Sequence, residues 1–228
     1  MIFTFQPLYL LLIVPAFLGW FAQWRLRQIY YRYLKVPNKK GIKGGEVAKV
    51  LLSSYNLDLP VLQTKRQMVN YYHPQNKTLN FCTNIIELAS ITSLGIVAHE
   101  VEHAVQDKQG FRFMNLRNKL AKSLAIMGQL SPLIFIWGIF FRNIFLVYLG
   151  IILLFGMAVF ALVSLPVELN ASNRALTKLQ EIGLADQEEI KMVAMVLRYA
   201  ALTYFVEATQ RIGTFLFVLL LLLMFRKS

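Results

Sequence analysis

Long stretches without a charged residue are the feature of this sequence that most restricts its fold. The first, residues 2–24, is long enough to cross the hydrocarbon core of a bilayer, which takes about 20 apolar residues. Two more, residues 124–141 and 144–165, are separated only by Arg142 and Asn143, so they predict a tight helical hairpin. Because 57% of all residues are hydrophobic, the sequence predicts a mainly helical integral membrane protein.

The end of the chain leaves two topologies open. Residues 212–225 are apolar but span only about 21 Å as a helix, so they cross a bilayer only if residues from about Phe205 are included. Arg226 and Lys227 follow them, and a basic C-terminus prefers the cytosolic side. A half-inserted final helix would satisfy that preference. The sequence therefore predicts three to four transmembrane helices.

The charges that flank the first apolar stretch set the orientation of the chain. No charge precedes this stretch, which excludes the pattern of a secretory signal peptide and predicts an uncleaved anchor. Six cations follow it: Arg25, Arg27, Arg32, Lys35, Lys39 and Lys40. By the positive-inside rule, the region after Trp24 is cytosolic and the N-terminus lies outside. We expect a multi-pass protein of the plasma membrane.

These segments divide the chain into five predicted parts. They are an anchor (1–24), a cytosolic part (25–123), a transmembrane hairpin (124–165), a second cytosolic part (166–211) and a C-terminal membrane segment (212–228). The two cytosolic parts predict one small α+β lobe. In the second cytosolic part, Pro166 suits an early helical position and Gly183 suits a helix end.

The first cytosolic part carries three local patterns. Residues 44–54 have apolar side chains at helical spacing and predict an amphipathic helix. Two β-prone stretches flank the sequence HPQNK at residues 73–77 and predict a β-hairpin. Ser90 or Thr92 can cap a further helix that runs to Gly110.

That last helix contains the sequence AHEVEHAVQ, which holds two of the three histidines of the chain. Residues four apart share one face of a helix, so His99 and His103 point the same way and can bind one metal ion. Glu100 is then placed beside a metal-bound water, as in the HExxH arrangement of zinc hydrolases. The alternative is an exposed, solvated helix face, but the apolar residues around the histidines argue against it.

A catalytic zinc site needs a third protein ligand. His73 is the one remaining histidine, at the tip of the predicted hairpin. Glu168 is the better candidate, because the transmembrane hairpin returns it to the membrane face that carries His99 and His103. A carboxylate at such a boundary is costly to bury without a partner such as a metal. The alternative role for Glu168 is to cap a helix N-terminus.

Several motifs together resemble the bacterial membrane-bound neutral zinc metallopeptidases of the YugP-like family. They are GGEVAKVLL, YYHPQNKTLNF, AHEVEHAVQ, LPVELNASNRAL and LRYAALTY, which extend along nearly the whole chain. The order of motifs is more distantly similar to HtpX-type proteases and CAAX-processing endopeptidases. The resemblance implies a zincin-like lobe and a gluzincin site, with His99, His103 and Glu168 as zinc ligands and Glu100 as the base.

Two positions depart from the patterns of these families. Four residues after the ligand glutamate, HtpX-like proteases have an aspartate that can orient a ligand histidine; this chain has Ser172, whose hydroxyl can still hydrogen-bond an imidazole. Before the hairpin proline we expect an aspartate, and this chain has His73. The alternatives for His73 are turn chemistry, which we favour, an extra metal ligand, or no role at all. For the oxyanion of the transition state, Tyr204 or Arg198 could donate, and we choose Tyr204. The alternatives are an ordinary packing tyrosine and a lipid-facing arginine.

The sequence thus predicts a zinc-dependent endopeptidase that acts at the cytosolic membrane face on peptide or membrane-protein substrates. The rival is a scaffold that binds metal without turnover. A transporter is disfavoured because the first three membrane segments contain no charge. The net charge is +12, but the sequence contains no nucleic-acid-binding motif, so the charge predicts attraction to anionic lipids instead. The single cysteine, Cys82, excludes an intrachain disulfide.

Overall fold

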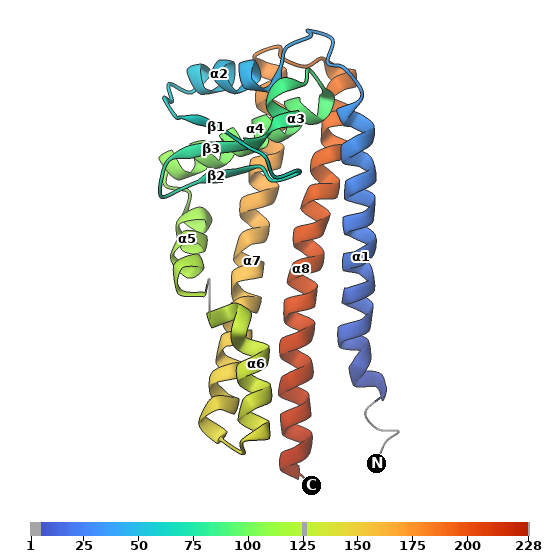
Figure 1. Ribbon diagram of the computed structural model, residues 1–228, viewed down its shortest axis with the longest axis vertical. Helices are drawn as coiled ribbons and strands as arrows, with labels where there is room; N and C mark the ends of the chain where they lie inside the picture. The colour runs from blue at the N-terminus through green and yellow to red at the C-terminus, as the bar shows by residue number, and fades with distance from the viewer. Residues whose placement is uncertain (1–5, 125–126, 228) are drawn as a thin grey trace. The chain divides into compact units, whose positions relative to one another are not determined.

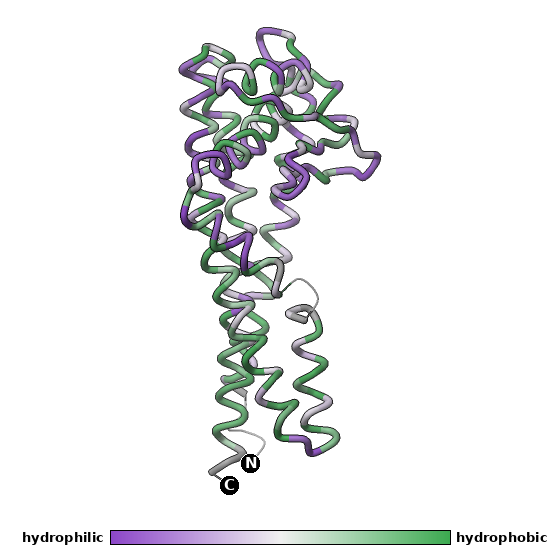
Figure 2. Tube along the Cα trace, turned by 90° about the vertical axis from the view of Figure 1, so that its left-hand side faces the viewer, coloured by the Kyte–Doolittle hydropathy of each residue, from purple (hydrophilic) through white to green (hydrophobic). Residues whose placement is uncertain are grey.

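The computed structural model describes residues 6–124 and 127–227, and the chain forms two compact units. The first unit comprises Met1–Gln23, Leu116–Pro166 and Thr203–Ser228, and the second comprises Trp24–Asn115 and Val167–Leu202. Residues 2–5 of the first predicted membrane segment and residues 125 and 126 of the second lie outside the described residues. Figure 2 shows hydrophobic residues along the helices of the first unit and mixed hydrophilic and hydrophobic residues in the second.

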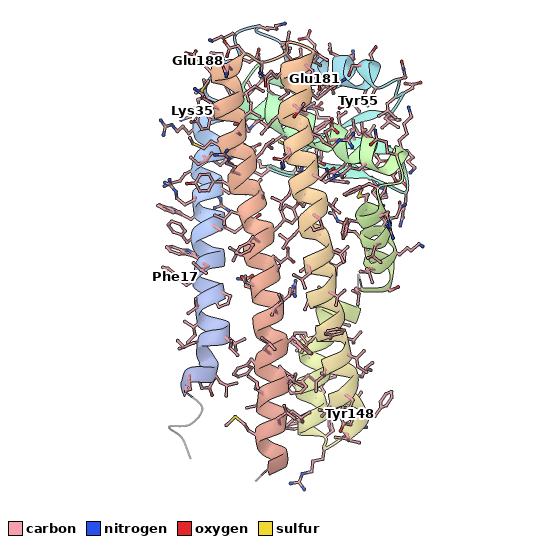
Figure 3. All side chains as sticks on the ribbon, turned by 180° about the vertical axis from the view of Figure 1, so that it is seen from behind. Phe17, Lys35, Tyr55, Tyr148, Glu181 and Glu188 are labelled. Carbon is pink, nitrogen blue, oxygen red and sulfur yellow. The ribbon has the colours of Figure 1, made fainter. Side chains whose placement is uncertain are left out.

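The first unit is built from long apolar helices. They are parts of α1 (Gln6–Leu34), α7 (Ile144–Glu181) and α8 (Gln187–Lys227), together with the shorter α6 (Met127–Phe140). Among the described residues, three helices are long and apolar enough to cross a membrane, namely Pro7–Leu34, Ile144–Glu181 and Gln187–Met224. Large apolar side chains such as Phe17 and Tyr148 project outward from these helices (Figure 3), where lipid can cover them.

Helices α1 and α8 pack closely around Pro15, which lies in the interior of α1. Pro15 has no N–H, so the carbonyl of Leu11 loses its helical donor. Gly213 of α8 lies against this carbonyl, where even a Cβ would come within 2.3 Å of the oxygen. The side-chain amide of Gln210 donates to the carbonyl of Pro15 at 3.1 Å. The bond from Gln210 satisfies the Pro15 carbonyl, and the small Gly213 lets α8 approach α1 closely at this point.

Two helix boundaries differ from those predicted. Pro166 does not begin a new helix, because α7 is one helix of 38 residues that runs through it. A proline removes a single N–H, and membrane helices tolerate this loss. The apolar stretch 212–225 is the end of α8, a continuous helix of 41 residues. Its length removes the objection that this stretch is too short to cross a bilayer.

The second unit contains a small sheet packed among helices (Figure 1). Its elements, besides the ends of the long helices, are α2 (Gly44–Ser54), β1 (Val61–Thr64), β2 (Tyr71–His73), β3 (Thr78–Cys82), α3 (Thr83–Glu87), α4 (Ile91–Lys108) and the start of α5 (Arg112–Leu124). The core includes residues without exposed surface such as Leu79, Phe81 and Leu94. The fold class predicted from the sequence, a mainly helical membrane protein with a small α+β portion, is confirmed.

The predicted β-hairpin is present, and a third strand extends it. β2 pairs antiparallel with β3, and β1 pairs parallel with β3, so the strand order is β1-β3-β2. This order leaves β2 at one edge of the sheet. β2 and β3 both contact α4, so the edge strand lies beside the helix that carries the two histidines.

α4 begins and ends at the predicted signals. The Ser90 hydroxyl accepts a hydrogen bond from the backbone N–H of Ser93 at 3.0 Å, so Ser90 is the N-cap. After the helix, Gly110 has a φ of 66°, which favours glycine and ends the helix. Residues from Ile91 to Gln106 are almost all buried, so α4 is a central helix rather than a surface one.

Gly44, the first residue of α2, allows the closest backbone approach in the second unit. A Cβ at this position would lie 1.9 Å from the carbonyl oxygen of Ile85 in α3. We expect Gly44→Ala to lower the free energy of unfolding by about 2 kcal/mol, because α2 and α3 must separate. The measurement is the Tm of the detergent-solubilised protein. Gly45→Ala is the matched control, since its Cβ would meet a side-chain methyl of Ile86 at 3.3 Å; equal Tm values for the two variants would contradict this account.

Candidate metal centre

Helix α4 places two imidazoles side by side, as the spacing of the histidines predicts. The ring centroids of His99 and His103 are 4.6 Å apart, and the ring planes are nearly perpendicular. Both residues are buried, with exposed fractions of 9% and 6%. The alternative of a solvated helix face is therefore wrong.

Helix α7 brings Glu168 to both rings. Its Oε2 atom lies 3.1 Å from Nε2 of His99 and 3.4 Å from Nε2 of His103. The Glu168 side chain is 1% exposed, so its carboxylate lies in the interior with the two imidazoles as neighbours. Among the described residues, these three side chains form one group whose ligand atoms lie within 4.8 Å of one another.

The spacing of the three ligand atoms fits a tetrahedral metal ion. Ligand atoms about 2.0–2.1 Å from a tetrahedral zinc are about 3.3 Å from each other. The two distances from Glu168 to the histidines, 3.1 and 3.4 Å, are close to this value. Two imidazoles and one carboxylate leave a fourth position for water or substrate, which is the ligand count of catalytic rather than structural zinc sites.

The second nitrogen of each imidazole has its own partner. Nδ1 of His99 lies 3.2 Å from the hydroxyl of Ser172, and Nδ1 of His103 lies 3.0 Å from Oε1 of Gln106. Because these partners hold Nδ1, the Nε2 atom of each ring faces Glu168. A ligand histidine fixed in this way presents the lone pair of Nε2 to a metal. The hydroxyl of Ser172 thus makes the hydrogen bond to a ligand imidazole that the sequence analysis considered for it.

Gln106 links the second histidine to the helix that carries Glu168, a role that the sequence analysis missed. Its amide N–H groups donate to the carbonyl of Val167 at 3.0 Å and to Oδ1 of Asn170 at 2.9 Å. Its amide oxygen accepts a hydrogen bond from Nδ1 of His103. The side chain has no exposed surface. Its position in the sequence could have indicated this role, because Gln106 lies seven residues after His99 and so shares its helix face.

We expect Gln106→Ala to weaken zinc binding by about 10- to 100-fold, because His103 loses its orienting partner. Titration of the purified apoprotein with zinc against a chromophoric chelator measures this change. Gln109→Ala is the matched control, since Gln109 is an exposed glutamine of the same turn that bonds Arg174 rather than a histidine. An unchanged zinc Kd in Gln106→Ala would show that the bond does not orient His103.

Glu100 lies against the edge strand of the sheet. Its Oε2 atom accepts a hydrogen bond of 2.9 Å from the backbone N–H of Tyr72 in β2. This N–H is not used in the pairing of β2 with β3, so it marks the outer edge of β2 beside Glu100. Glu100 is 9% exposed and follows His99 directly in α4. The carboxylate that we predict as the base is thus next to both the candidate metal ligands and an edge strand.

The side chain of Tyr72 fastens this edge strand to α4. Its hydroxyl donates to Oδ2 of Asp107 at 2.7 Å, and Lys77 makes an ion pair with the same carboxylate. Burial raises the pKa of the Tyr72 phenol well above its usual value, and the bond to Asp107 raises it further. Tyr72 therefore stays protonated and remains a donor at neutral pH.

A buried charge pair joins α4 to α7 beside the site, and the sequence analysis did not identify it. Nε of Arg174 donates to Oε2 of Glu102 at 2.7 Å, and the hydroxyl of Tyr55 donates to Oε1 of the same carboxylate. The Glu102 side chain is 1% exposed. A carboxylate buried this deeply needs such partners. The pair holds the ligand helix and the Glu168 helix together at a second point.

The sequence also singles out His73, Arg198 and Tyr204. Nδ1 of His73 accepts the backbone N–H of Asn76 at 3.1 Å, which is turn chemistry, and His73 is not in the metal-ligating group found among the described residues. Arg198 is exposed and lies on α8 in the second unit. Tyr204 is half-buried on α8 and belongs to the first unit. Its role as an oxyanion donor stays a prediction.

Comparison with known proteins gives two matches. Residues 8–224 match the family described as "Putative neutral zinc metallopeptidase". The chain is also 31% identical over 199 residues to "Putative membrane protease YugP" of Bacillus subtilis (strain 168), which covers 86% of this chain and 88% of that protein. No solved structure gave a significant match.

Proposed function

The chain belongs to the family of neutral zinc metallopeptidases, and from this we propose that it is a zinc-dependent endopeptidase of the gluzincin type. The observation that carries the proposal is the convergence of His99, His103 and Glu168 next to Glu100. The name of the Bacillus relative, a membrane protease, and the three apolar helices agree with an enzyme that is anchored in a membrane.

The proposed mechanism needs no covalent intermediate. His99, His103 and Glu168 would hold a zinc ion, which when bound would supply a Lewis acid that polarises a carbonyl and makes water more acidic. Glu100 takes a proton from the attacking water and passes it to the leaving amine. Ser172 and Gln106 keep the two imidazoles in place throughout. Tyr204 is our proposed donor to the oxyanion.

We propose that the substrate binds as an added strand along β2. An edge strand has unpaired backbone groups on its outer side, and an extended peptide can pair with them. The outward N–H of Tyr72 bonds the Glu100 carboxylate at 2.9 Å, so a peptide that pairs with this edge would take over that bond and would lie beside the base. Backbone pairing gives affinity with little selection among side chains, which suits peptide or membrane-protein substrates with an accessible extended segment.

Proteolysis by the purified, reconstituted protein tests the proposed function. We expect unfolded β-casein to be cut into fragments that mass spectrometry detects. Removal of metal with 1,10-phenanthroline should abolish the cutting, and added zinc should restore it. A protein that binds zinc and cuts nothing under these conditions would instead be the metal-binding scaffold.

We also propose that the site faces the cytosol of a bacterial plasma membrane, as the flanking cations predict. The single cysteine makes this testable, because Cys82 is buried and can be replaced by Ala. In that background, Lys49→Cys places a thiol on the exposed face of α2. A membrane-impermeant maleimide should label it only after cells are permeabilised. Labelling of intact cells would place the second unit on the outer side.

A further inference from the structure

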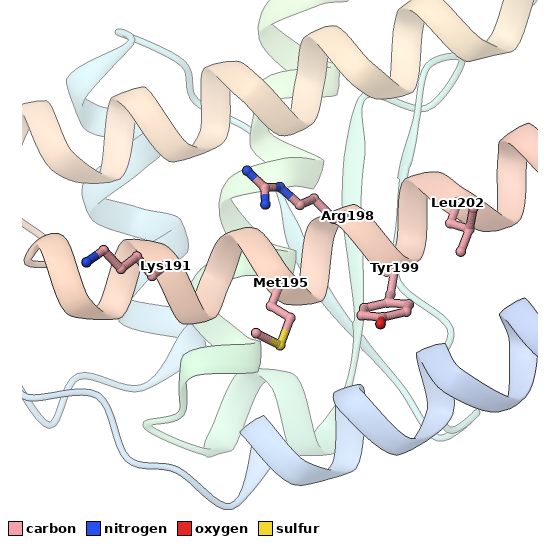
Figure 4. A pocket seen from close by; sticks show the side chains of 5 residues that line it. All are labelled: Lys191, Met195, Arg198, Tyr199 and Leu202. Carbon is pink, nitrogen blue, oxygen red and sulfur yellow. The ribbon is translucent and has the colours of Figure 1, made fainter.

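A cavity of about 450 Å³ lies along α8 in the second unit and shares no residue with the metal centre. Its lining comprises Lys191, Met195, Arg198, Tyr199 and Leu202, five residues of one helix (Figure 4). A volume of this size is within the range of sites that bind small molecules. The lining therefore indicates what kind of molecule fits.

The charged residues of the cavity are all cationic. Within the described part of the chain, neither Lys191 nor Arg198 makes a hydrogen bond or an ion pair, although both side chains are exposed to the cavity. A third cation, Arg25 of α1, adjoins it, because its guanidinium donates to the hydroxyl of Tyr199 at 3.4 Å and lies 5.5 Å from the ring centroid. Three neighbouring cations without an acidic residue in the lining favour an anionic ligand.

The lining alternates cationic and apolar side chains along α8 and ends on the apolar Leu202. Lys191 and Leu202 are about 16 Å apart along α8, with Met195 and Arg198 between them. Leu202 directly precedes the residues of α8 that belong to the first unit, and Arg25 directly follows the apolar stretch of α1. The apolar end of the cavity is thus the end from which both helices continue into their apolar segments.

We propose that this cavity binds one anionic phospholipid. Its phosphate lies between Lys191 and Arg198, beside Met195, and its acyl chains run past Tyr199 and Leu202 toward the apolar segments. Basic sites at the cytosolic ends of membrane helices recognise anionic headgroups in this way. A soluble acidic peptide would satisfy the cations but would gain nothing from the apolar end. Because the lipid is bound away from the metal centre, this inference does not depend on the proposed peptidase activity.

Native mass spectrometry of the full chain, released from detergent with added phosphatidylglycerol or phosphatidylcholine, tests the proposal. We expect one molecule of phosphatidylglycerol to stay bound at lipid concentrations at which phosphatidylcholine does not. The double substitution Lys191→Gln and Arg198→Gln should weaken this binding about thirtyfold, because each cation near the surface contributes to headgroup attraction.

The double substitution Lys40→Gln and Lys49→Gln is the matched control. Both lysines are exposed and lie outside the cavity, and their replacement removes the same amount of positive charge. We expect it to bind phosphatidylglycerol within twofold of the unchanged chain. Equal weakening by the two double variants would show diffuse attraction to charge and would overturn the site. Displacement of the lipid by an equal concentration of free glycerol phosphate would also overturn it, since the cavity would then select a soluble anion.

Discussion

Glu100→Gln is expected to reduce peptide hydrolysis by about a hundred- to ten-thousandfold, the usual contribution of a general base. An amide cannot take the proton of the attacking water. Its oxygen can still accept the backbone N–H of Tyr72, which Glu100 accepts at 2.9 Å, so the fold around the site should be kept. The initial rate of casein cleavage, measured beside the zinc content of the same sample, checks both expectations.

Glu87→Gln is the control for this substitution, because Glu87 is an exposed glutamate outside α4. It should leave the rate unchanged. If Glu100→Gln cleaved as fast as the unchanged protein, another group would be the base. If it lost zinc as well as activity, Glu100 would act on the metal centre rather than on the substrate.

Glu168→Ala is expected to weaken zinc binding by at least about a hundredfold. Removing a side chain that only orients a ligand histidine lowers metal affinity by up to about a hundredfold, and removing a ligand itself should lower it further. The substitution also leaves His99 and His103 without the carboxylate that lies 3.1 and 3.4 Å from their Nε2 atoms. The zinc Kd, from competition with a chelator of known affinity, measures the change.

The control for Glu168→Ala is Glu181→Ala, which removes an exposed glutamate at the end of the same helix. Its zinc Kd should not change. A Glu168→Ala protein that bound zinc as tightly as the unchanged chain would mean that a different residue completes the site.

Features that depend on local spacing could be predicted from the sequence. The four-residue interval between His99 and His103 sets a shared helix face, and Ser90 and Gly110 mark the two ends of that helix. The membrane helices follow from uncharged stretches, because the cost of burying a charge in lipid leaves few alternatives. The approach of Glu168 to the histidines was also predictable, because a hairpin that leaves a membrane and returns brings its end back to the starting face.

Features that depend on packing between distant segments were missed. The role of Gln106 depends on where Val167 and Asn170 lie, sixty residues away in the chain, and no local pattern encodes that contact. The same holds for Arg174, whose partner Glu102 is on another helix. Strand β1 has only four residues and pairs parallel with β3, so neither a turn nor an alternating pattern marked it.

Pro166 shows the limit of single-residue signals. A proline after an apolar stretch suits the first turn of a helix, and this interpretation divided α7 into two helices. The observed helix continues through Pro166 for fifteen more residues, to Glu181.

The central claim is that His99, His103 and Glu168 together hold one zinc ion. X-ray absorption at the zinc edge of the purified protein tests it most directly. We predict a first shell of nitrogen and oxygen only, at about 2.0–2.2 Å, with the outer-shell scattering of two imidazoles. A shell containing sulfur at about 2.3 Å, or a spectrum with the same two imidazoles in a His99→Ala variant, would contradict the account.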